Sequence, residues 1–154
     1  MSPEGPLDRV AEPIDGGVGQ HRRHDSAEKH VAGAAQYVDD APEPPGALHV
    51  QFGLSQTAHG RLKTLDLAAV RAAPGVVGVF TAADIVGKND VSPVMGDDPM
   101  FAEDVVSYWG QALFAVAAET RDAARRAARL ARVEIEDRPA ILTIDAAMDA
   151  QSWL

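Results

Sequence analysis

The sequence predicts an α+β domain, and three stretches of it carry that prediction. In 48–54 (LHVQFGL) large apolar residues alternate with polar or small ones, the period of two expected of a strand with one buried face. The run 76–81 (VVGVFT) is rich in β-branched residues and indicates a buried strand. In 120–132 alanines and a leucine recur at helical spacing, with arginines on the other side. We therefore expect helices packed on strands around one core.

The composition sets limits on the kind of protein. A length of 154 residues with 46% hydrophobic content suffices for one domain with a core, and the net charge of −9 disfavours nucleic acid and membrane partners. Cysteine is absent, which excludes disulfides, thiolate zinc sites and iron–sulfur clusters from these residues. The start is acidic and proline-rich, unlike a secretory signal, so we expect a cytoplasmic protein.

Residues 1–24 combine proline, glycine and charge without a sustained apolar period. Such a segment buries too little surface to offset the entropy of ordering, so it is expected to form a flexible N-terminal arm. The folded domain is expected over 25–145, and 146–154 is expected to begin a linker.

The first half of the domain has the following expected elements. A weaker strand, 61–65, follows the alternating one, and Asp66 is placed to cap a short helix over 67–73. Pro74 ends that helix and leads into the buried strand. The segment 84–100 is too rich in glycine, proline and acid for a regular element, and is expected to be a loop.

The second half begins with two apolar runs, 105–109 and 111–119, separated by one glycine, which together predict a hairpin. Thr120 is expected to cap the long helix that ends at 132. A strand over 133–137 and a helix over 145–150 complete the prediction.

Two groups of residues suggest chemistry, and for both we favour a plainer interpretation. His21, His24 and His30 with Asp25 and Asp39 are of the types that bind zinc or iron, but their spacing fits no known metal-binding module. Solvated surface histidines are the favoured interpretation. Adjacent carboxylates on a strand face opposite ways, so a turn and cap role is favoured for Asp39 and the Asp40 that follows it.

Ser55 and His59 suggest a hydrolase, but no GxSxG motif or strand–elbow–helix pattern surrounds the serine, which disfavours that hypothesis. The loop 86–100 (VGKNDVSPVMGDDPM) is the remaining candidate site. Its Val94 and Met95 are apolar residues between polar neighbours, and such residues line substrate passages or anchor loop tips. Both interpretations stay open on the residues alone.

Four stretches in fixed order resemble a known family: 24–67 (from HDSAEKHVAGAAQYVDD to LKTLDL), 74–90 (PGVVGVFTAADIVGKND), 101–120 (FAEDVVSYWGQALFAVAAET) and 136–147 (EDRPAILTIDAA). They are similar to the N-terminal α/β hammerhead domain of the molybdenum-binding subunit of xanthine dehydrogenases, in the xanthine dehydrogenase and aldehyde oxidase family. The resemblance implies a mixed β-sheet packed by two or three helices. It also implies that 146–154 leads toward molybdopterin-binding domains that this sequence does not include.

The resemblance implies a parent enzyme of purine catabolism, an oxidoreductase that hydroxylates hypoxanthine and xanthine to urate at a molybdenum centre and passes electrons to NAD. Its molybdopterin would lie in the remaining domains of the molybdenum subunit, and its iron–sulfur clusters and FAD on a partner subunit or another region. Because the family's pterin-binding and catalytic residues have no counterparts here, we assign no catalytic, cofactor-binding or metal residue, and expect the 154-residue chain alone to be inactive. Only Val94 and Met95 are expected to line the substrate funnel.

Two alternatives within this fold remain. One is a non-catalytic binding or assembly module that reuses the hammerhead fold. The other is the hammerhead domain of an enzyme that resembles aldehyde oxidase and not xanthine dehydrogenase.

Overall fold

The structure is a computed structural model that describes residue 19 and residues 22–153, in two compact units, 1–43 and 44–154. In the first unit the described elements are the short helix α1 (Ala27–Val31) and the 3-10 turn η1 (Val38–Asp40). Most of the expected N-terminal arm, 1–18 together with 20 and 21, lies outside the described residues. The arm and the domain limits therefore remain predictions.

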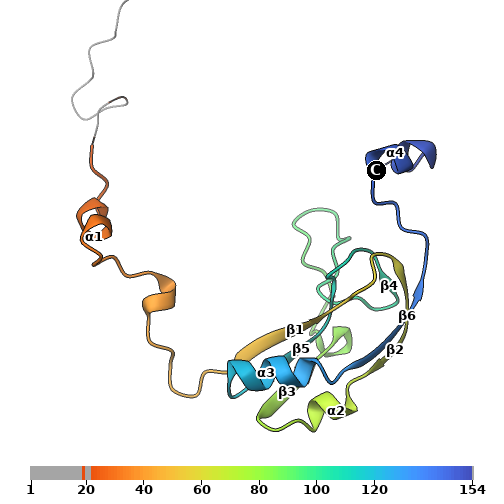
Figure 1. Ribbon diagram of the computed structural model, residues 1–154, viewed down its shortest axis with the longest axis horizontal. Helices are drawn as coiled ribbons and strands as arrows, with labels where there is room; N and C mark the ends of the chain where they lie inside the picture. Colours follow the sequence, from red (N-terminus) through yellow and green to blue (C-terminus); the bar gives the residue numbers. More distant parts are fainter. Residues whose placement is uncertain (1–18, 20–21, 154) are drawn as a thin grey trace, which may run out of the picture. The chain divides into compact units, whose positions relative to one another are not determined.

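The second unit contains two three-stranded antiparallel sheets (Figure 1). The α+β fold class is confirmed, but two antiparallel sheets replace the expected single mixed one. Sheet A has the order β1-β5-β3 and sheet B the order β4-β2-β6. The strands are β1 (His49–Leu54), β2 (Gly60–Asp66), β3 (Val76–Phe80), β4 (Val105–Val106), β5 (Ala112–Ala118) and β6 (Arg132–Asp137).

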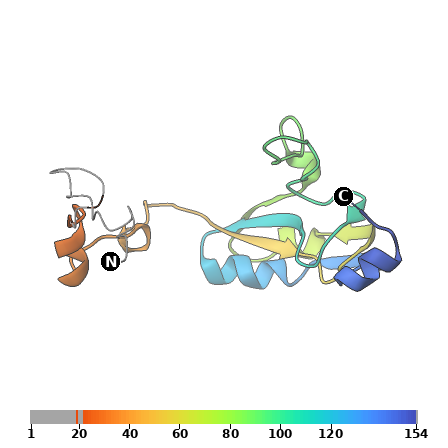
Figure 2. The same cartoon turned by 90° about the horizontal axis from the view of Figure 1, so that it is seen from above.

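Three helices belong to this unit: α2 (Ala68–Arg71), α3 (Arg121–Ala128) and α4 (Ile144–Asp149). The expected cap at Thr120 forms, because its Oγ1 accepts from the Ala123 amide, whereas the N-cap of α2 is Leu67 and Asp66, one residue earlier, accepts from the Ala68 amide through Oδ1. The helix α3 lies against β1 and β5, on one side of sheet A (Figure 2). No helix in the described part of the chain is long and apolar enough to cross a membrane.

The core lies between sheet A, sheet B and the helices α2 and α3. Because the helix α3 presents alanines to the sheet, its backbone approaches β5 closely. The buried residues of the main cluster are Leu67, Val70, Ala102, Val106, Leu113, Phe114, Val116 and Ala127.

The expected hairpin over 105–119 is wrong. β4 pairs with β2 in sheet B, whereas β5 is the central strand of sheet A. The segment between them crosses from one sheet to the other, and the buried Gln111 makes that crossing possible. Its side-chain oxygen accepts from the Ser107 amide at 2.7 Å and its backbone oxygen from the Ser55 amide at 2.9 Å, and no buried side-chain nitrogen or oxygen of the described residues lacks a partner.

The expected burial of two strands is also wrong. The alternation in β1 is real, but its large apolar side chains lie on the side of sheet A away from α3, and its small and polar residues lie beneath the helix. β3 is an edge strand with Phe80 on this same exposed side, and is not a buried strand. We call this surface the open face of sheet A; its large side chains are Leu48, Val50, Phe52, Leu54 and Phe80.

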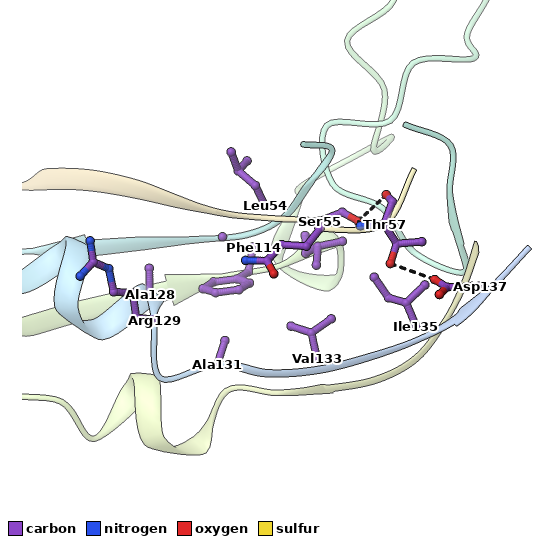
Figure 3. Close-up of a pocket in the computed structure, with 13 residues that line it drawn as sticks. Leu54, Ser55, Thr57, Phe114, Ala128, Arg129, Ala131, Val133, Ile135 and Asp137 are labelled. Carbon is purple, nitrogen blue, oxygen red and sulfur yellow. Dashed lines mark hydrogen bonds between the residues drawn. The ribbon is translucent and has the colours of Figure 1, made fainter. Parts of the chain in front are cut away.

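The reason for this orientation is steric at Gly53. A Cβ atom built on Gly53 would lie 2.0 Å from the Phe114 ring, which is itself fully buried. The covered side of β1 therefore has no room for a large side chain at this position, and the adjacent large residues project to the other side. Figure 3 shows Leu54 and Phe114 projecting to opposite sides of the strands.

Candidate functional site

The loop between the 3-10 turn η2 (Ala82–Asp84) and β4 is the strongest site candidate from the sequence, and it projects from the side of sheet A opposite α3 (Figure 2). Val94 and Met95 are among its most exposed residues, at 83% and 79%. Their exposure fits either a lining or a contact role, but nothing in the described residues surrounds them to form a cavity.

Asn89 fixes the base of this loop. Its Nδ2 donates to the Phe101 carbonyl at 2.7 Å and to Glu103 Oε1 at 2.8 Å, while its Oδ1 accepts from the Phe101 amide at 3.1 Å. Phe101 is buried, so the amide side chain ties the start of the loop to a residue anchored in the fold. Nothing in the sequence pattern alone showed this role.

Asp90 organises the inside of the loop. Its Oδ1 accepts from the Ser92 amide at 3.0 Å and from the Asp98 amide at 3.4 Å, and its Oδ2 accepts from Lys88 Nζ at 3.2 Å. The hydrogen bond from the Ser92 backbone, followed by the contribution of Lys88, lowers the pKa of the Asp90 carboxyl below its ordinary value. These hydrogen bonds therefore order the loop, and the loop holds the Val94 and Met95 side chains toward solvent.

The structure does not bring Ser55 and His59 together as a nucleophile and base. The Ser55 hydroxyl donates to the Thr57 carbonyl at 2.9 Å and accepts from the Thr57 amide at 3.0 Å. His59 Nδ1 donates to the Pro139 carbonyl at 2.7 Å, just after the end of β6. Both groups therefore stabilise turns, and the geometry gives the hydrolase hypothesis no support.

A groove of about 420 Å³ lies beside Ser55, where the end of β1 meets α3 and β6 (Figure 3). Leu113, Phe114 and Val133 give it apolar walls. Two of its polar groups bond to each other, since Thr57 Oγ1 donates to Asp137 Oδ1 at 3.1 Å. Sequence reasoning missed the groove because its walls come from segments far apart in the chain.

The histidines of the first unit pair locally. His30 Nδ1 lies 2.6 Å from the Tyr37 hydroxyl, and the His24 ring packs edge-on against His30 at 5.4 Å. Asp40 Oδ2 accepts from the Tyr37 amide at 2.9 Å, which is the cap role favoured for it. His21 lies outside the described residues.

The described residues offer no group of side chains that could hold a metal ion. They contain no cluster of three His, Asp or Glu side chains, and no buried side-chain nitrogen or oxygen without a hydrogen-bond partner.

Comparison with known proteins gives consistent matches. Residues 32–139, more than half of the chain, match the family model for "Aldehyde oxidase and xanthine dehydrogenase, a/b hammerhead domain". A xanthine dehydrogenase from Oryza sativa is 42% identical over 136 residues, as is xanthine dehydrogenase 1 from Arabidopsis thaliana. Each alignment covers 88% of this chain and 10% of the relative, so the chain spans about a tenth of their length.

Solved structures share the fold. An aldehyde oxidoreductase from Desulfovibrio desulfuricans superposes with a TM-score of 0.78 at 28% identity, covering 88% of this chain and 16% of that one. A reconstituted CO dehydrogenase from Oligotropha carboxidovorans superposes with a TM-score of 0.73 at 30% identity, covering 86% of this chain and 18% of that one.

Proposed function

We propose a structural role for this chain, which belongs to the aldehyde oxidase and xanthine dehydrogenase family as its a/b hammerhead domain. In this proposal the chain is a supporting domain of a cytoplasmic molybdenum hydroxylase that resembles xanthine dehydrogenase, and it supplies no catalytic residue. The observation that carries the proposal is the commitment of Ser55, His59 and Asp90 to turns and loop geometry. With these backbone partners, Ser55 and His59 form no hydrogen bond to each other of the kind that joins a nucleophile to its base.

The proposed contribution to function is the position of Val94 and Met95 beside the substrate funnel of the parent enzyme. Support comes from the loop itself, because Asn89 and Asp90 hold it by hydrogen bonds while both apolar side chains face outward. A fixed loop presents an apolar lining at a lower entropic cost than a mobile one.

The proposed parent enzyme hydroxylates hypoxanthine and xanthine and passes electrons to NAD. Its molybdopterin belongs to the remaining domains of the molybdenum subunit, and its iron–sulfur clusters and FAD to a partner subunit or another region of the polypeptide. The purine substrate is supported over an aldehyde by the relatives, since xanthine dehydrogenases share 42% of aligned residues and the aldehyde oxidoreductase 28%.

The test is a chimera in which this chain replaces the matched 136-residue segment of the rice xanthine dehydrogenase. The chimera should retain molybdenum and form urate from xanthine, whereas the chain alone should form none. A matched deletion of the segment serves as the control for background activity. Loss of molybdenum from the chimera, or urate formation by the isolated chain, would contradict the proposed role.

Within that chimera, Met95→Asp tests the lining. A charge in the funnel should raise the KM for xanthine while the molybdenum content stays unchanged, because the loop is held by Asn89 and Asp90 and not by Met95. Val86→Asp, a fully exposed residue at the start of the same loop, is the control. Equal KM values for both variants would place Met95 outside the funnel.

A further inference from the structure

The open face of sheet A is an apolar surface that its own unit covers only in part, where the buried Phe101 ring lies 6.4 Å from the Phe52 ring. Its five large side chains, Leu48, Val50, Phe52, Leu54 and Phe80, are between 46% and 59% exposed. In the register of the sheet, Phe52 and Phe80 flank Ala115 on the central strand, so the exposed rings belong to one continuous surface. Monomeric proteins rarely expose contiguous apolar patches of this kind without an interaction that uses them.

The distribution of charged residues also distinguishes sheet A from sheet B. The three strands of sheet A contain no Asp, Glu, Lys or Arg, whereas β2 and β6 of sheet B contain seven, including the Lys63–Glu136 ion pair at 2.7 Å. β1 and β3 are edge strands, and exposed edges in natural sheets are usually protected by charged residues. An uncharged edge strand with an apolar face is typical of one that lies inside an assembly.

We propose that the open face docks against the part of a molybdenum hydroxylase polypeptide that lies outside the matched segment, through an apolar surface on that polypeptide. This inference rests on the proposed function. The length of the relatives supports it, because about nine tenths of their polypeptide lies outside the aligned region and is available as a partner. The helix α3 does not cover this face, because it packs on the opposite side of the sheet.

Charge argues against other occupants. A net charge of −9 repels nucleic acid and anionic lipid, which reward a basic surface. A second copy would bring another −9 to the same contact. An apolar surface on the remaining polypeptide matches a face whose three strands carry no charged residue.

The experiment uses the double variant Phe52→Asp, Phe80→Asp. The matched control is Leu130→Asp, because Leu130 has the same 47% exposure as Phe80 but follows α3 on the covered side. Each change is made in the isolated chain, to check its thermal unfolding, and in the rice chimera, to measure how much molybdenum-containing enzyme assembles. Should the aspartates prevent folding of the isolated chain, Phe52→Thr replaces them, since threonine suits an exposed strand.

The double variant should leave the isolated chain folded and lower the yield of assembled chimera about tenfold or more, whereas Leu130→Asp should leave it unchanged. Equal yields for the double variant and the unaltered chimera would overturn the docking proposal and leave the proposed function standing. Failure of the unaltered chimera would instead contradict the proposed function, and the docking with it. A stable dimer of the isolated chain that the double variant dissolves would assign the face to a second copy and overturn the proposal.

Discussion

The two faces of sheet A both carry large apolar side chains, but on different strands. On the covered face, Phe114 and Val116 of the central strand pack under the alanines of α3. On the open face the central strand carries Ala115, and the large residues lie on the edge strands. Apolar residues on a strand can form a core within the domain or a surface for contact beyond it. Which of the two they form depends on the elements that pack against them.

The largest expected effect compares one phenylalanine from each face. Phe114→Ala should lower the free energy of unfolding by about 3–5 kcal/mol, because a side chain that is 1% exposed leaves a cavity in close-packed surroundings. Phe52→Ala, at 48% exposure, should lower it by about 1 kcal/mol or less. Urea unfolding of both variants measures the difference. Similar losses would mean that the open face is packed as tightly as the covered one.

The fold class and most elements could be predicted because their signals are local. The cap at Thr120, the alanine stripe after it and the alternation before Ser55 each lie within one segment. Pairing is not local, so the sequence did not show that β4 and β5 belong to different sheets, or that Gln111 supports the crossing between them. Periodicity gave the spacing of the β1 side chains, but the lack of room for a side chain beside Phe114, which is distant in sequence, appears only in the folded structure.

The candidate site was predicted only as far as its composition allowed. A loop rich in glycine, proline and acid was expected between residues 84 and 100, and the structure has one there. The hydrogen bonds of Asn89 to Phe101 depend on where the chain returns after the loop, which no local pattern specifies. Whether Val94 and Met95 line a funnel depends on polypeptide that would have to lie against them, so it stays a prediction.

A smaller effect is expected from one methyl group placed on each face. In Gly53→Ala the new Cβ meets the buried Phe114 ring, which cannot move without disturbing the core, and the loss should be about 1–3 kcal/mol. In Gly78→Ala the Cβ approaches the Phe80 ring at 3.0 Å, but that ring is half exposed and free to turn.

The Gly78→Ala variant should therefore be neutral, or more stable by up to about 1 kcal/mol because alanine restricts the unfolded chain. Both glycines lie within strands of sheet A, and neither has a positive φ, so the substitution itself is the same. Urea midpoints of the two variants give the comparison. A clear loss of stability in Gly78→Ala would show that the open face, too, has no room to adjust.

The smallest expected effect compares α3, which packs on one face of sheet A, with α4, which has no buried residue. Thr120 and Thr143 make the same cap, each accepting from the amide three residues on at 3.1 Å. Thr120→Ala should cost about 1 kcal/mol of global stability, because α3 buries three alanines against the sheet and cannot fray without exposing it. Thr143→Ala should change global stability by less than about 0.5 kcal/mol, because α4 has no buried residue.

Amide exchange distinguishes the two cases directly. In Thr143→Ala the Ala146 amide should exchange faster while the sheet amides keep their protection, since α4 opens independently of the core. In Thr120→Ala faster exchange should extend from Ala123 to the β5 amides beneath the helix, because the covered face depends on α3. If β5 kept its protection in Thr120→Ala, the helix would not be what distinguishes the two faces, and the placement of the large side chains on central or edge strands would have to account for the difference.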